Sequence, residues 1–104
     1  SPLDPLYYAM LGTRAFTHMV VGEDLAAAEW AERAARSPGA HVLIAMIASA
    51  TQAMIGDDVK AAQWAANVRS RNPVLTREDF FRAFPMKSEV TRARVANALA
   101  DLGF

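Results

Sequence analysis

The chain has 104 residues, no cysteine, and 11 basic and 11 acidic residues that give a formal net charge of zero. This length suffices for one domain with a core of its own, and the lack of cysteine excludes disulfides, thiolate zinc sites and a cysteine nucleophile. Every apolar run is interrupted before the roughly 18 to 20 residues that a membrane span needs, so we expect a cytoplasmic domain without a membrane segment.

Six stretches with apolar residues at helical spacing predict six helices and no strand. Asp4-Pro5 starts the first stretch, and Asp24 and Asp58 are the expected N-caps of the second and fourth helices. Thr76 and Asp79 have the spacing of a capping box at the fifth. The expected helices cover residues 5–21, 24–36, 40–55, 58–71, 76–83 and 88–102.

The first four predicted helices contain a repeat with a period of 34 residues. Gly22-Glu23-Asp24 is followed by alanines at fixed offsets and by Trp30, and Gly56-Asp57-Asp58 is followed by the same pattern and by Trp64. We expect both tryptophans to be mostly buried, at equivalent places. A 34-residue period in a helix-forming sequence is typical of tetratricopeptide hairpins, so the predicted fold is all-α and tetratricopeptide-like. The predicted domain, 1–104, has one hairpin over 4–37, a second over 38–73 and capping helices over 74–104.

The last third of the chain is predicted to cap this stack of hairpins. Phe80, Phe81 and Phe84 form a short aromatic helix, Ser88 opens a final helix, and Gly103 is placed to end it. A stack of hairpins exposes the apolar flank of its last unit, so such a cap is physically required.

Short motifs from most of the chain occur together in one known family. They are Asp4-Pro5, Gly22 with Ala27, Trp30-Ala31-Glu32-Arg33-Ala34, Gly56-Asp57 with Ala61, Asn72-Pro73, Phe84-Pro85, and Ala98-Leu99 before Leu102-Gly103. With them the chain resembles the C-terminal tetratricopeptide-like region of many bacterial class III adenylate/guanylate cyclases and winged-helix transcriptional activators. The resemblance implies a regulatory part of a longer signalling or transcription protein, with a nucleotide cyclase as one candidate parent.

Residue patterns that would support chemistry are missing. His18 and His41 have no second metal ligand at helical spacing, and Asp57-Asp58 lacks the alternating oxygen ligands of a calcium loop. The basic residues between Arg69 and Arg94 are not arranged with aromatic residues as in a nucleic-acid reader. We therefore expect no catalytic residue, cofactor or metal, no enzyme activity, and no direct binding of nucleic acid.

The first helix of each tetratricopeptide hairpin lines the concave face of the array, which here predicts an apolar binding face. Such a face suits an amphipathic helix, and we expect a protein partner or self-association, including a homodimer. The alternative is that the C-terminal helices of the domain itself fill the groove. The predicted concave-face residues are Gly12, Phe16, Met19, Met46, Ala50 and Ala53.

Two other functions remain open from the sequence. A sensory domain for a small apolar ligand would contain a closed cavity lined by Phe16, Met19, Met46 and Phe80. A dimerisation domain of the parent protein would instead expose an apolar patch on an outer helix.

Overall fold

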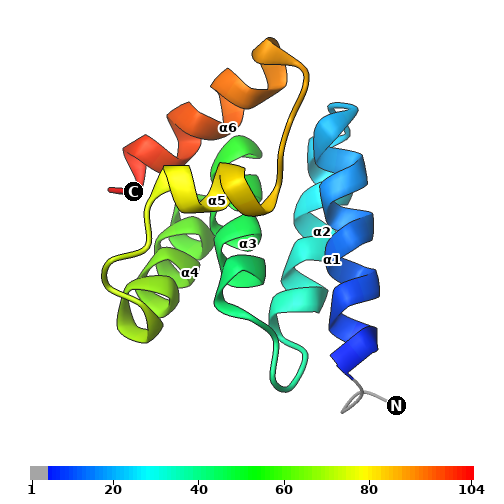
Figure 1. The fold of residues 1–104 in the computed structure, drawn as a ribbon, viewed down its shortest axis with the longest axis vertical. Coiled ribbons are helices and arrows are strands. Elements are labelled where there is room, and N and C mark those ends of the chain that lie inside the picture. Colours follow the sequence, from blue (N-terminus) through cyan, green and yellow to red (C-terminus); the bar gives the residue numbers. More distant parts are fainter. Residues whose placement is uncertain (1–4) are drawn as a thin grey trace.

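The computed structural model describes residues 5–104, and this part of the chain contains six α-helices and no strand (Figure 1). The helices are α1 (Pro5–Val20), α2 (Asp24–Ala35), α3 (Val42–Met54), α4 (Asp58–Arg71), α5 (Arg77–Ala83) and α6 (Glu89–Asp101). The all-α prediction is confirmed, and the predicted bounds agree within two residues. The predicted N-cap Asp4 lies outside the described residues.

The helices form two hairpins followed by a C-terminal pair. α1 packs against α2, α3 packs against α4, and the contact between α2 and α3 joins the two hairpins. α6 packs on α3, while α1 lies at the edge of the molecule farthest along the stack from α4 (Figure 1). α3 is therefore the central element, and α1 has a side that no later helix covers.

The N-caps of α2 and α4 lie one residue earlier than predicted. They are Glu23 and Asp57, and not Asp24 and Asp58, because a left-handed glycine comes directly before each cap. The Asp57 side chain accepts a hydrogen bond from the backbone N–H of Lys60 at 3.0 Å. Asp24 and Asp58 lie instead in the first turn of their helices, where a carboxylate still interacts favourably with the helix dipole.

The signals predicted for the C-terminal pair of helices are confirmed. Thr76 caps α5, and its backbone N–H donates to the Asp79 carboxylate at 3.0 Å while its hydroxyl accepts from the Asp79 N–H at 3.3 Å. Ser88 caps α6. Gly103 follows the end of this helix with a φ of +94°.

The core is built around α3, which is buried without interruption from Ile44 to Gln52. Its polar side chains have partners. The hydroxyls of Ser49 and Thr51 each donate to a carbonyl oxygen of their own helix at 2.8 Å, and the Gln52 amide donates to α2. Buried alanines on α2 and α4 let their backbones approach this helix closely.

Candidate interaction site

The six residues predicted to line a concave binding face lie in or beside the core. Met19, Met46 and Ala50 have no exposed surface. Gly12 is buried as well, and only two of the six keep partial exposure. In this structure most of the set is therefore not accessible to a partner protein. Its members are Gly12, Phe16, Met19, Met46, Ala50 and Ala53.

Aromatic residues of the C-terminal segment occupy the space in front of these residues. The ring of Phe84 lies 5.5 Å from that of Phe16 and 5.1 Å from that of the fully buried Phe80, centroid to centroid. Packing is also tight at Gly12, where a Cβ would come within 2.7 Å of Ile44 Cδ1. The same contacts occupy the place where the alternative of a small-ligand sensor would need a closed cavity. This burial agrees with the alternative in which the C-terminal helices fill the groove.

Trp30 and Trp64 lie at equivalent positions, and both are partly buried against the core. The guanidinium groups of Arg14 and Arg33 lie 4.0 and 4.6 Å from the centre of the Trp30 rings. Trp64 borders a shallow hollow of about 270 Å³ together with Glu32 of α2 and Arg36, which follows this helix. Two guanidinium groups therefore already pack against the rings of Trp30.

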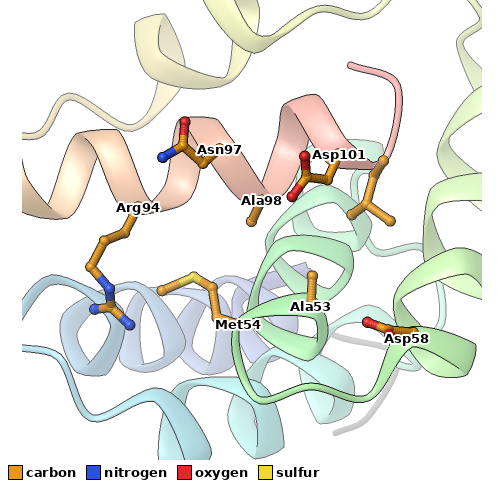
Figure 2. Close-up of a pocket in the computed structure, with 8 residues that line it drawn as sticks. Ala53, Met54, Asp58, Arg94, Asn97, Ala98 and Asp101 are labelled. Atoms are coloured by element: carbon orange, nitrogen blue, oxygen red, sulfur yellow. The ribbon is translucent and has the colours of Figure 1, made fainter.

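A larger cleft, of about 480 Å³, lies between α6, the end of α3 and the start of α4 (Figure 2). Asp58 and Asp101 border it from opposite sides, and Arg94 forms an ion pair with Asp24 at the start of α2. The lining contains no serine, cysteine or histidine that could act as a nucleophile or as its base. It consists of Ala53, Met54, Asp58, Arg94, Asn97, Ala98, Asp101 and Leu102.

Among residues 5–104, no group of three or more histidine, cysteine or acidic side chains is placed to hold a metal ion. None of the helices in this part of the chain has the length and hydropathy required to cross a bilayer.

The outer face of α1 is a continuous uncharged surface on the side opposite the core. Its side chains are spaced alternately four and three residues apart, so they form one line along the helix. Leu6 is 69% exposed and Met10 is 70% exposed. We use the name outer face of α1 for Leu6, Met10, Thr13, Thr17 and Val20.

A shallow groove of about 430 Å³ opens on this face beside Ala9 and is bordered by Met10, Thr13 and Arg14. Arg14 borders the groove while its guanidinium lies over Trp30, and the His18 ring contacts Glu23 at 3.0 Å. The five residues of the outer face of α1 carry no charge. Exposed apolar side chains that gather on one face of a helix are typical of a site that another protein covers.

From the sequence, an exposed apolar patch on an outer helix was one of the alternatives, and it was not assigned to the first helix. α1 has two stripes. Leu11, Ala15 and Met19 face the core, whereas Met10 and Val20 lie on the opposite side. The signal was present in the sequence, because a helix that is apolar on both sides must be covered on both sides.

A scan against protein-family models and searches of curated proteins and of solved structures found no match to this chain.

Proposed function

We propose that this chain is a non-catalytic protein–protein interaction module with a tetratricopeptide-like architecture. The proposed architecture is supported by the 34-residue equivalence of the turns at Gly22 and Gly56 and of the caps at Glu23 and Asp57. The module belongs to a longer bacterial regulator of the signalling or transcription class, in line with the family that the sequence resembles.

The outer face of α1 is the observation that carries this proposal. The Met10 side chain is 70% exposed to solvent, although it is apolar. Its neighbours along the face are apolar residues and threonines. Water at such a surface is released when a second apolar surface covers it, and this release favours association. The proposed contact thus lies on the edge of the helical stack and not in its concave groove.

Binding of a small ligand has less support than protein binding. The groove residues that would have lined an apolar cavity are packed against Phe80 and Phe84. The cleft beneath α6 is open, its lining is half apolar and half polar, and the carboxylates of Asp58 and Asp101 border it. Neither place offers the mostly apolar, enclosed environment that small-molecule sites provide.

The proposal is tested with Met10→Glu and the matched control Val90→Glu. Val90 is 73% exposed on α6, so both changes place the same carboxylate on an exposed apolar position, but on different surfaces. The size of the complex that contains the protein in its own cells is measured by native chromatography. We expect Met10→Glu to shift the protein to a smaller size, while Val90→Glu leaves it unchanged. If both variants shifted the complex to a smaller size, or neither did, the proposed contact face would be contradicted.

A further inference from the structure

Building on the proposed function, we infer that the outer face of α1 pairs with the same face of a second copy of this chain, with the two helices antiparallel. A twofold pair of this kind needs a surface that is complementary to itself. A line of small and apolar side chains without charge meets this condition, because no residue on it meets a like charge in the second copy.

The spacing of the face fits an antiparallel register. The line from Met10 through Thr13 to Thr17 follows the alternation of three and four residues that lets side chains of one helix insert between those of another. With the twofold axis between Leu11 and Gly12, Met10 lies beside Thr13 of the second copy. Leu6 then lies beside Thr17 of the second copy, and the two helices overlap along nearly their whole length.

One of the two hydroxyls on this face already has a hydrogen-bond partner within the chain. The Thr17 hydroxyl donates to the Thr13 carbonyl oxygen of its own helix at 2.9 Å, so its donor has a partner before association. Its methyl group is then the part offered to the second copy. A buried hydroxyl without a partner would cost free energy, and this internal bond avoids that cost.

The flanking residues favour the antiparallel over the parallel pair. In the antiparallel register Arg14 of one copy is level with Ala9 of the second copy, and the two Arg14 positions are offset by about 7.5 Å along the helices. In a parallel pair in register the two Arg14 residues would be level, and their like charges would repel. Antiparallel helices also place the positive end of each helix dipole beside the negative end of the other.

The area of the face sets the strength of this pairing. α1 has 16 residues and is about 24 Å long and 10 to 12 Å wide. Covering it on both copies removes on the order of 1,000 Å² in total, which is about a tenth of the 5722 Å² surface of each copy. This is the lower limit for specific association. The dimer is therefore weak, with a dissociation constant on the order of 10 µM or higher.

The first test is sedimentation velocity of the purified chain between about 10 and 500 µM, a range that brackets the expected dissociation constant. We expect a monomer–dimer equilibrium in which Met10→Glu raises the dissociation constant by at least about tenfold and Val90→Glu does not change it. A wild-type chain that stays monomeric throughout would overturn the inference. The proposed function would still stand if Met10→Glu disrupted the complex formed in cells, since the occupant of the face would then be a different protein.

The second test measures the register by disulfide formation, which the absence of natural cysteine makes unambiguous. Leu6→Cys and Thr17→Cys chains are oxidised separately and as a mixture. In the inferred register only the mixture forms a cross-linked dimer quickly. Two identical positions are offset by about 16 Å along the helices, beyond the separation of about 4.4 to 6.8 Å between Cα atoms that a disulfide spans. Rapid cross-linking of each variant alone would show a parallel pair and overturn the inference, as would a mixture that dimerises without cross-linking.

Discussion

Gly22 and Gly56 adopt the same left-handed backbone conformation 34 residues apart, each with a φ of +83°. The N–H groups of these glycines donate to Met19 and Ala53, and those of the next residues, Glu23 and Asp57, donate to carbonyl oxygens five residues back, both at 2.9 Å. This is the bonding of a helix that ends at a left-handed glycine. Each glycine fixes the angle between the two helices of its hairpin.

Alanine at either glycine should destabilise the fold by a similar amount. A Cβ at Gly22 or at Gly56 would meet no atom within 4 Å, so the cost comes from the left-handed backbone alone. We expect a loss of roughly 1–2 kcal/mol in the free energy of unfolding for each variant, measured by urea denaturation. Strongly unequal losses would show that the two turns are not equivalent.

Met46→Glu should unfold the domain. The Met46 side chain is fully buried in α3, and a carboxylate there would have no cationic partner. An unpaired buried charge costs on the order of 3–5 kcal/mol, which is comparable to the whole stability of a small domain. Circular dichroism should show a loss of helix, whereas Met10→Glu on the outer face of α1 should retain the wild-type spectrum. A folded Met46→Glu variant would mean that the C-terminal segment opens to let this position reach water.

Trp30→Ala and Trp64→Ala should each cost less than truncation of a fully buried tryptophan. Both side chains are partly exposed, so we expect a loss of roughly 1–3 kcal/mol in the free energy of unfolding, below the 3–5 kcal/mol typical of buried aromatic residues. The Trp30→Ala variant also loses the contacts of this ring with Arg14 and Arg33. Thermal unfolding followed by circular dichroism measures both losses. A loss below about 1 kcal/mol at Trp64 would favour a binding role for the exposed part of its ring.

The capping box of α5 should respond to acid. The backbone N–H of Thr76, and then its hydroxyl, hold the pKa of the Asp79 carboxyl below its ordinary value. A lowered pKa means that the folded state favours the ionised carboxylate. Its contribution to stability is therefore present above about pH 4 and is lost as the pH falls through the lowered pKa.

Titration of the Asp79 carboxyl by NMR measures this shift directly. Thr76→Val removes the hydroxyl donor but keeps the backbone N–H. We expect the pKa of Asp79 in this variant to rise part of the way toward the ordinary value. An unchanged pKa would show that the hydroxyl does not contribute, and a full return would show that the backbone bond depends on it.

Helix positions could be predicted from the sequence because their signals are local. Gly56, Thr76 with Asp79, and Ser88 each determine a turn or cap through bonds to residues within five positions along the chain. The N-cap of α4 was predicted at Asp58, one residue after its actual position at Asp57. Two adjacent aspartates can both act as a cap, and only the conformation of the preceding glycine decides between them.

Which helix faces are buried and which are exposed could not be predicted in the same way, because burial depends on contacts between residues far apart in the sequence. Phe84 lies against Phe16 across 68 positions, and Phe80 joins the same hydrophobic cluster as Met46. Nothing in the helical spacing around Met46 shows that a later helix covers it. The outer face of α1 differs, because its alternating spacing was visible once the core stripe had been assigned.

The central claim is that the domain associates through the outer face of α1. Amide chemical shifts of the isotopically labelled chain, followed by NMR through a dilution series, test it most directly. We predict concentration-dependent shifts at Met10, Thr13 and Thr17, with the residues around the cleft, such as Asp58 and Arg94, unchanged. Shifts confined to that cleft, or none on α1 when the chain associates, would contradict the account.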